Sequence, residues 1–384
     1  MPGSTTPTTA AVLTPPARGA IATVSVRGAE AVALADRFFS SLGKISVCNA
    51  PIGRILVGHW QAEGEAVGEE LVVAKLADDV VEIHCHGGVQ ASQRILKHLA
   101  ASGCQVESWQ SRTTSQHSDA IVAEAKLELP TAVTSQAALH LLDQANGALS
   151  REIATIGKLV EEANFEVAAQ KLDHLLSLAP FGRHLTQPWL IVIAGPPNVG
   201  KSSLLNKIVG YDRAIVLDMP GTTRDVLHAT TALDGWPVQF SDTAGIRVSD
   251  DEIEQAGIAK AKAALKTADL AIVMHDATNL KPDELDQSLK ELPSALHVVN
   301  KIDLADALRL PDSGEMLATS AVTGQGVPDL ISSIVSHLIP RVPQTDDPIP
   351  FTSRQVDGLR QLWEHVKQHQ ADAALQSIQL LLNA

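Results

Sequence analysis

The stretch GPPNVGKSSL, residues 195–204, directly follows the apolar run WLIVIA and decides the fold of the second half of the chain. It matches Gly-x-x-x-x-Gly-Lys-Ser, a glycine-rich turn between a strand and a helix whose backbone N–H groups converge on phosphate oxygens. The helix N-terminus adds partial positive charge, Lys201 reaches the β- and γ-phosphates, and the Ser202 hydroxyl binds Mg²⁺. The stretch therefore predicts a nucleoside triphosphate site on an α/β fold.

A second motif, NKID (300–303), ends an apolar strand candidate and predicts which base is bound. The Asp303 carboxylate can accept hydrogen bonds from the N1 and N2 hydrogens of guanine, a pair that adenine does not offer. The segment TSA (319–321) predicts a loop that closes over the same base. From these motifs we expect the nucleotide to be held by Asn198, Val199, Gly200, Lys201, Ser202, Ser203, Asn300, Lys301, Asp303, Ser320 and Ala321.

Two further motifs predict the metal ligands and the contact to the γ-phosphate. In DTAG, Asp242 can hold a Mg²⁺-bound water and the Gly245 N–H can contact the γ-phosphate. The motif GTTRD offers Thr222 or Thr223 as the second hydroxyl ligand of the metal. Along the chain the four motifs follow one another as GPPNVGKS, GTTRD, DTAG and NKID. This order predicts a GTP-binding protein that uses Mg²⁺.

The composition limits the class of protein. The chain has 384 residues, 45% of them hydrophobic, which is enough for two or three packed domains. It shows neither a secretory leader nor an apolar run long enough to span a bilayer, so we expect a cytoplasmic protein without membrane contact. Three cysteines without paired spacing fit a reducing compartment. The net charge of −14 disfavours polyanions, so any tRNA contact is expected to be local or indirect.

The pattern along the chain predicts three domains. Mixed strand and helix candidates in residues 1–118 predict an N-terminal α+β domain. Alternating strands and helices in residues 189–340 predict a P-loop α/β domain with a mostly parallel sheet. Apolar residues at three- and four-residue steps predict helices in residues 119–188, and the end of the chain, 341–384, again has a helical pattern. We therefore expect the P-loop domain to be inserted in a helical domain.

Local patterns add further expectations about single elements. The first ten residues are rich in Thr and Pro and are expected to be disordered. The segment AEAVALADRFFSSLG predicts a helix that ends at Gly43. Residues 69–77 and 80–88 predict strands, and residues 201–209 predict the helix that follows the glycine-rich turn.

Taken together, these motifs resemble the MnmE (TrmE) family of tRNA-modification GTPases. The likeness is carried by GPPNVGKSSLLN, AIVLDMPGTTRDV, DTAGIR and DDEIEQAGIAKA, and by TPPARGAIATVSVRG and EIHCHGG near the N-terminus. It covers the first domain as well as the P-loop domain, which separates this family from other bacterial GTPases. The resemblance implies a homodimeric GTPase that acts on the wobble uridine of tRNA together with a flavoprotein partner.

The resemblance also implies how hydrolysis is organised. Ile246 follows DTAG where Ras-like proteins have a water-positioning glutamine, so another group must act. Asn198 and carbonyls of the loop 214–221 would bind K⁺ against the γ-phosphate, with the G domains pairing. Glu254 stands at the family's catalytic glutamate position and would orient the attacking water, while Arg247 would steady the mobile loop. The alternative for Glu254 is a first-turn carboxylate that interacts with the helix dipole.

In the first domain the resemblance implies a folate site and a dimer contact. Arg18 in TPPARG and His86 in EIHCHGG would contact a tetrahydrofolate derivative. A metal site at His84, Cys85 and His86 is disfavoured, because alternation on a strand puts only the two histidines on one face. The alternative for both histidines is that they are surface groups with ordinary partners.

The sequence departs from the family pattern at Leu217 and Met219-Pro220 in the loop 214–221 and in three other places. EELVVAKLADDV replaces the Thr-Gly-Glu-Asp loop, and SWQSRTTSQHSDAIVAEA replaces the Arg-Pro-Gly-Glu-Phe signature. The printed chain ends at Ala384 without the terminal Cys-x-Gly-Lys that is associated with the tRNA chemistry. We expect GTP switching to be retained, and two functions stay open: tRNA modification, or a GTP-dependent switch in ribosome assembly or signalling.

Overall fold

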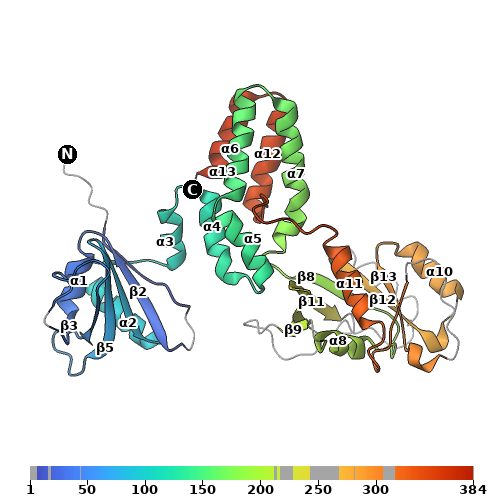
Figure 1. Ribbon diagram of the computed structural model, residues 1–384, viewed down its shortest axis with the longest axis horizontal. Helices are drawn as coiled ribbons and strands as arrows, with labels where there is room; N and C mark the ends of the chain where they lie inside the picture. Colours follow the sequence, from blue (N-terminus) through green and yellow to red (C-terminus); the bar gives the residue numbers. More distant parts are fainter. Residues whose placement is uncertain are drawn as a thin grey trace. The chain divides into compact units, whose positions relative to one another are not determined.

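The computed structural model describes residues 7–15, 19–43, 45–211, 214–216, 228–242, 268–280, 282–305 and 316–383. The chain forms two compact units, residues 1–118 and residues 119–384. Figure 1 shows the first unit as one sheet with helices, and the second as a group of helices joined to a separate α/β sheet.

A seven-stranded sheet forms the first unit, in the order β3-β4-β5-β6-β2-β1-β7. Neighbouring strands are antiparallel except β1 and β7, which are parallel. Helices α1 and α2 pack on the sheet through fully buried side chains such as Val24, Ile83, Ile95 and Leu99. The bounds are β1 Thr9–Val12, β2 Ile21–Arg27, α1 Ala31–Phe38, β3 Phe39–Ser41, β4 Ile55–Trp60, β5 Glu69–Ala77, β6 Val80–His86, α2 Val89–Ala101, β7 Gln105–Val106 and α3 Trp109–Gln116.

Two local predictions for this unit are wrong. Strand β1 begins at Thr9, inside the stretch expected to be disordered, because it pairs with β2 on one side and β7 on the other. The helix expected to reach Gly43 ends at Phe38, and the chain continues as the edge strand β3. Phe39 lies opposite Trp60 of β4 and is buried, so strand pairing outweighs the local helical pattern.

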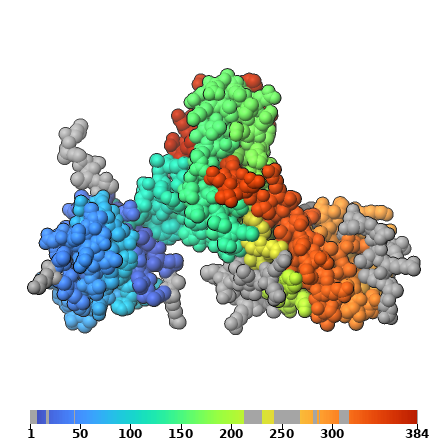
Figure 2. All heavy atoms as spheres, viewed as in Figure 1, coloured from blue at the N-terminus to red at the C-terminus, as the bar shows by residue number. Residues whose placement is uncertain are grey.

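The helical layer of the second unit is built from two segments of the chain. One segment precedes the sheet in the sequence and the other follows it. Helix α12 packs against α7 and α13, and α13 packs against α6 and α4. The predicted helical stripe is buried, with Ile153 and Ile156 fully inaccessible. The surface of this helical layer is made by both segments, green and red in Figure 2. The bounds are α4 Ala120–Glu128, η1 Leu129–Thr131, α5 Ser135–Ala145, α6 Ala148–Glu161, α7 Phe165–Arg183, α12 Ser353–Lys367 and α13 Ala371–Leu382.

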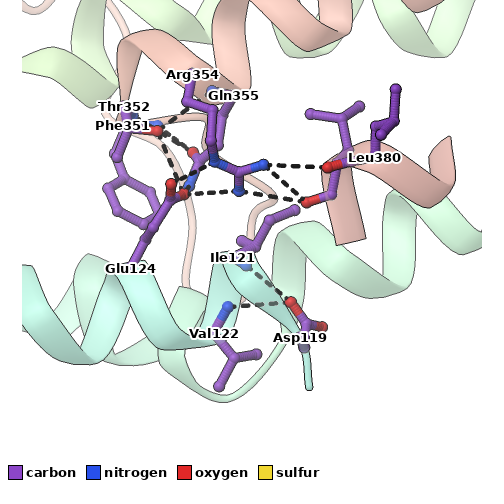
Figure 3. A network of polar contacts seen from close by, with 10 residues as sticks. Asp119, Ile121, Val122, Glu124, Phe351, Thr352, Arg354, Gln355 and Leu380 are labelled. Carbon is purple, nitrogen blue, oxygen red and sulfur yellow. Dashed lines mark hydrogen bonds and ion pairs between the residues drawn. The ribbon is translucent and has the colours of Figure 1, made fainter. Parts of the chain in front are cut away.

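A polar network holds the early and late helical segments together (Figure 3). Glu124 of α4 accepts hydrogen bonds from the guanidinium of Arg354 and, at 2.7 Å, from Nε2 of Gln355, both on α12. Arg354 also donates to the carbonyl of Leu381 on α13 at 3.2 Å. Asp119 caps α4 by accepting the N–H groups of its first turn. Helix α4 is therefore joined at one point to α12 and α13, two consecutive helices that follow it by more than 200 positions.

The second unit also contains a seven-stranded sheet in the order β14-β13-β12-β8-β11-β10-β9. The strands from β14 to β11 are parallel, and β10 and β9 are antiparallel to their neighbours, which confirms a mostly parallel P-loop sheet. The bounds are β8 Trp189–Ala194, α8 Lys201–Val209, β9 Ala214–Val216, β10 His228–Leu233, β11 Trp236–Asp242, β12 Leu270–Asp276, η3 Ala277–Asn279, α10 Pro282–Glu291, β13 Leu296–Asn300, η4 Ile302–Leu304, β14 Met316–Ala318 and α11 Val327–Leu338.

Candidate nucleotide-binding site

The carboxyl ends of the parallel strands bring the predicted motifs to one edge of the sheet. Strand β8 ends at Ala194, β11 at Asp242, β12 at Asp276 and β13 at Asn300. Asp276 is the register partner of Asn300 in the neighbouring strand. Ligands of open α/β sheets bind outside this edge, so the topology itself places the glycine-rich turn beside NKID.

The glycine-rich turn has a backbone that only particular residues can adopt. Gly195 has φ +145°, Asn198 +62° and Gly200 +102°. A Cβ added at Gly200 would lie 2.4 Å from Nδ2 of Asn300, and one at Gly195 would lie 2.7 Å from the carbonyl oxygen of Met274. Glycine is therefore required at both ends of the turn. The repeated positive φ angles give the concave backbone that binds anions through N–H groups.

The first turn of α8 carries the predicted phosphate and metal ligands. The Lys201 ammonium donates to the carbonyls of Gly195 and Pro196, at 2.9 Å each, so the side chain lies across the turn. Ser202 and Ser203 are exposed on the same helical turn. The structure therefore brings a cation and two hydroxyl-bearing residues to the end of the strand where the sequence predicts phosphates.

The buried side chain of Asn300 connects three segments of the site. Its Nδ2 donates to the Val199 carbonyl in the glycine-rich turn at 2.8 Å. Its Oδ1 accepts from the N–H of Ala321 at 3.1 Å and from the hydroxyl of Thr319 at 3.3 Å. Asn300 is only 1% exposed, and all three contacts are made by protein groups. Its role is therefore to hold the turn, NKID and TSA together.

Asp303 lies beside the TSA segment, as the sequence predicts for two parts of one base site. It is exposed in the short turn η4, whose first residue, Ile302, donates its N–H to the Thr319 carbonyl at 3.3 Å. Ser320 is fully buried, and its hydroxyl accepts from the N–H of Thr323 at 3.1 Å. An exposed carboxylate thus stands next to a rigidly held loop.

Lys301 has a partner that the sequence reading missed. Its backbone is left-handed, with φ +67°, and its ammonium lies 2.6 Å from Oδ2 of Asp276. Burial acts to raise the pKa of Asp276, but hydrogen bonds from Lys301 and Thr278 outweigh it and hold that pKa below its usual value. The sequence feature that could have indicated this ion pair is Asp276, the acidic residue that ends LAIVMHD. This strand lies next to the one that leads into NKID.

Two family models match the chain, one over each unit. Residues 8–108 match the model described as GTP-binding protein TrmE N-terminus, and residues 190–301 match the 50S ribosome-binding GTPase model. The tRNA modification GTPase MnmE of Roseiflexus sp. (strain RS-1) is 31% identical, with 94% of this chain and 88% of that protein covered. The chain belongs to the MnmE family of tRNA modification GTPases. It is therefore a GTP-binding enzyme that hydrolyses GTP.

A second MnmE relative gives the same assignment. The tRNA modification GTPase MnmE of Chlamydia felis (strain Fe/C-56) is 34% identical, with 84% of this chain and 79% of that protein covered. Among solved structures, the G domain of the T. maritima FeoB iron transporter covers 39% of this chain and 99% of its own, at 25% identity and a TM-score of 0.27.

The two histidines of the motif EIHCHGG, His84 and His86, lie on β6 of the first unit. His86 is exposed, and its Nδ1 lies 3.3 Å from Oε1 of Glu69. His84 points to the same face, with Nδ1 3.1 Å from the Thr23 hydroxyl. Cys85 is buried between them, and burial raises the pKa of its thiol to about 11. Within the described residues, no group of three His, Cys, Asp or Glu side chains is placed to hold a metal ion.

Part of the predicted site lies outside the described residues. Asp242 is described only as the last residue of β11. The predicted site residues outside the described ranges are Arg18, Thr222, Thr223, Gly245, Arg247 and Glu254.

In the described ranges, no helix is both long enough and apolar enough to span a membrane.

Proposed function

We propose that the chain binds GTP at this sheet edge and hydrolyses it in a K⁺-stimulated reaction that depends on pairing of the G domains. We propose further that this cycle serves the modification of wobble uridine in tRNA. The observation that carries the nucleotide part is the Asn300 side chain, which joins the glycine-rich turn, NKID and TSA through hydrogen bonds to Val199, Thr319 and Ala321. Such a junction holds phosphate and base contacts at a fixed spacing.

The turn fits a triphosphate and its Mg²⁺ ion. A side chain at Gly195 or Gly200 would collide with the Met274 carbonyl or the Asn300 amide, so glycine lets the turn pack against β12 and β13 in the shape that would hold a phosphate. The Ser202 hydroxyl would hold Mg²⁺ together with Thr223 and Asp242. Bound there, Mg²⁺ neutralises the charge that develops on the β- and γ-phosphate oxygens.

Lys201 is proposed to exchange partners when the nucleotide binds. Its contacts include hydrogen bonds to the neutral carbonyls of Gly195 and Pro196. Hydrogen bonds from an ammonium to anionic phosphate oxygens are shorter and stronger than those to neutral carbonyls. The ammonium would therefore exchange these carbonyls for the β- and γ-phosphate oxygens.

Guanine selection is assigned to Asp303, whose exposed carboxylate would accept from N1 and N2 of the base. Ser320 and Ala321 would close over the base, and the aliphatic stem of Lys301 would cover its face. Support comes from the contact between η4 and the TSA segment through the Ile302 N–H. A wrong base would leave the carboxylate without donors, which makes the discrimination strong.

Hydrolysis is assigned to residues inferred from the family resemblance. Glu254 would orient the attacking water, Arg247 would steady the loop after DTAG, and Asn198 would bind K⁺ with carbonyls of residues 214–221. The support on the described residues is that Asn198 is exposed on the phosphate turn in a left-handed conformation. Ile246 cannot position water as a glutamine does, which favours a separate catalytic group.

The role in tRNA modification is supported by relatives that carry this name and match over 79–88% of their length. We assign residues 1–118 to a dimerising domain in which Arg18 and His86 contact a tetrahydrofolate derivative. Residues 119–188 and 341–384 form the helical domain, with the G domain, 189–340, inserted between them. The partners would be a second copy and a flavoprotein, with tRNA contacted locally or indirectly.

The test of the nucleotide part is a titration of the full chain with GTP and ATP in Mg²⁺, followed by turnover in K⁺ and in Na⁺. We expect GTP to bind at least a hundredfold more tightly than ATP and turnover to be faster in K⁺. Glu254→Ala should retain GTP binding and lose most of the turnover. Equal affinity for the two nucleotides would contradict the proposal.

The test of the tRNA part is a measurement of wobble-uridine modification in cells that lack this gene, with and without the wild-type copy. Loss of the modification and its return with the copy are expected. Unchanged modification, together with selective GTP binding, would instead identify a GTP-dependent switch in ribosome assembly or signalling. Titration of the chain and of its Arg18→Ala variant with a tetrahydrofolate tests the folate site.

A further inference from the structure

Two short turns at the edge of the sheet are joined by one ion pair. Turn η3 follows β12 and turn η4 follows β13, and the two turns pack against each other. Their strands are adjacent and parallel, with Asp276 in register with Asn300. The ammonium of Lys301 lies 2.6 Å from Oδ2 of Asp276. It therefore connects NKID and η4, together called the base loop, to the neighbouring strand β12.

The carboxylate of Asp276 is itself held in one orientation. Its Oδ1 accepts from the N–H of Thr278 at 2.9 Å and from the hydroxyl of the same residue at 2.7 Å. The side chains of Asp276 and Lys301 are 20% and 28% exposed, so solvent screens the pair only in part. The sheet, rather than the exposed loop, therefore determines where the Lys301 ammonium lies.

The base loop has two anchors, one on each side. Asn300 ties it to the glycine-rich turn and to TSA. Lys301 ties it to β12, and its left-handed backbone, which is uncommon for a residue other than glycine, persists because both flanks are held. Asp303 comes two residues after Lys301, within the turn that these anchors position.

We propose that Asp276 is a positioning residue for guanine selection. By holding the Lys301 ammonium it orients η4, so that the Asp303 carboxylate faces the N1 and N2 hydrogens of guanine. It also keeps the ammonium away from that carboxylate, whose acceptor capacity the base requires. The inference rests on the proposed role of Asp303 in base selection.

Inosine triphosphate provides a probe of this positioning. Its base keeps the N1 hydrogen of guanine and lacks the 2-amino group, so the ratio of its Kd to that of GTP reports the contact to one Asp303 oxygen. One hydrogen bond to a charged acceptor corresponds to roughly a ten- to hundredfold ratio. A variant that merely destabilises the domain weakens both nucleotides equally and leaves this ratio unchanged.

The experiment titrates the full chain with GTP and ITP in Mg²⁺, in the wild type and in Asp276→Asn. We expect the ITP/GTP ratio of Kd values to fall at least fivefold in Asp276→Asn. Asp276→Glu keeps the charge and is expected to restore part of the ratio. Asp286→Asn makes the same charge change at an exposed position on α10 and is expected to keep the wild-type ratio.

Thr278→Val is the second variant, because Thr278 is exposed and its replacement does not threaten the fold. It removes the hydroxyl bond to Asp276 and keeps the backbone N–H, so a smaller fall in the same ratio is expected. An unchanged ratio in Asp276→Asn, or in Thr278→Val where Asp276→Asn does not fold, overturns the inference. The proposed base selection itself is overturned if the wild type binds GTP and ITP equally well and Asp303→Asn has the same ITP/GTP ratio of Kd values.

Discussion

The indole of Trp236 stacks on the imidazole of His140, with ring centroids 5.9 Å apart and planes inclined by 14°. Trp236 begins β11 at the tip of the β10–β11 hairpin, whereas His140 belongs to α5. The ring of Phe181 on α7 meets the edge of the same indole at 5.3 Å. One aromatic cluster therefore joins the GTPase sheet to the helices. In the sequence, this hairpin lies between the motifs GTTRD and DTAG.

The Trp236 contact is expected to contribute strongly to stability. Trp236 is 4% exposed, and Trp236→Ala would leave a cavity between the hairpin, α5 and α7. We expect the free energy of unfolding to fall by about 3–5 kcal/mol, measured by urea denaturation. Trp236→Phe keeps an aromatic ring and should lose less than half of that. A loss below about 1 kcal/mol in the alanine variant would show that the cluster does not hold the two layers together.

Gly200→Ala is expected to abolish GTP binding. The new Cβ would lie 2.4 Å from Nδ2 of Asn300, in a backbone with φ +102° that L side chains rarely adopt. Nucleotide affinity should fall at least a hundredfold, which corresponds to about 2.7 kcal/mol. Gly210→Ala, at the other end of α8, is the matched control. Its φ is −86°, and an added Cβ would lie 3.2 Å from its nearest atom, the carbonyl oxygen of Asn206. That variant should bind GTP within about threefold of the wild type; equal binding by Gly200→Ala would contradict the steric argument.

Stability is expected to fall at acidic pH because of His275. Its Nε2 lies 3.2 Å from Nδ1 of His297, whose Nε2 donates to the Leu292 carbonyl at 3.1 Å. A carbonyl only accepts, so His297 presents a lone pair at Nδ1 and His275 donates to it. Burial, together with the charge that His297 carries when protonated, lowers the pKa of His275 from 6.5 to about 4.

The sign follows from this depressed pKa. Above pH 6.5 His275 is neutral in both the folded and the unfolded chain, and the stabilising difference is fully present. As the pH falls from 6.5 towards 4, the unfolded chain takes up a proton that the folded chain resists, and stability is lost. At pH 5 we expect a loss of about 2 kcal/mol relative to pH 7.5, measured by denaturant unfolding. Over the same pH interval, the stability of His275→Gln should fall by about 2 kcal/mol less than that of the wild type. Equal losses of stability in the two proteins would exclude His275 as the source.

The contact between Glu124 and Arg354 is expected to couple α4 to α12 and α13. Glu124→Ala, Arg354→Ala and the double variant form a double-mutant cycle, read out by urea unfolding. The Arg354 side chain is 40% exposed, so solvent screening limits the coupling energy to about 1 kcal/mol. Asp357→Ala and Arg360→Ala, an exposed pair on α12, supply a reference cycle with coupling near zero. Additive losses in the Glu124 cycle would show that the network in Figure 3 packs without coupling.

Much of the nucleotide site was predictable because its chemistry is encoded in short motifs. The helix expected at 201–209 occurs as Lys201–Val209. Gly195 and Gly200 stand where the backbone needs them, because only a residue without Cβ tolerates those φ angles and close neighbours. The parallel sheet followed from the alternation of strands and helices.

Other features depend on pairing between distant segments and left no local signal. The pattern after residue 38 is helical, yet Phe39 pairs with Trp60 in an edge strand. Lys301 was expected to contact the nucleotide, and nothing within NKID indicates that Asp276 holds its ammonium. The docking of Trp236 on His140 belongs to the same class, since an apolar residue in a hairpin can face many partners.

Motif and periodicity are sufficient to predict the glycine-rich turn and the two sheet classes, because backbone conformation and amphipathic spacing are local properties of the chain. Tertiary structure decided which side chains pair with one another and which layers touch. Those outcomes depend on burial and on strand register between residues that lie tens to hundreds of positions apart, where no short pattern carries the information.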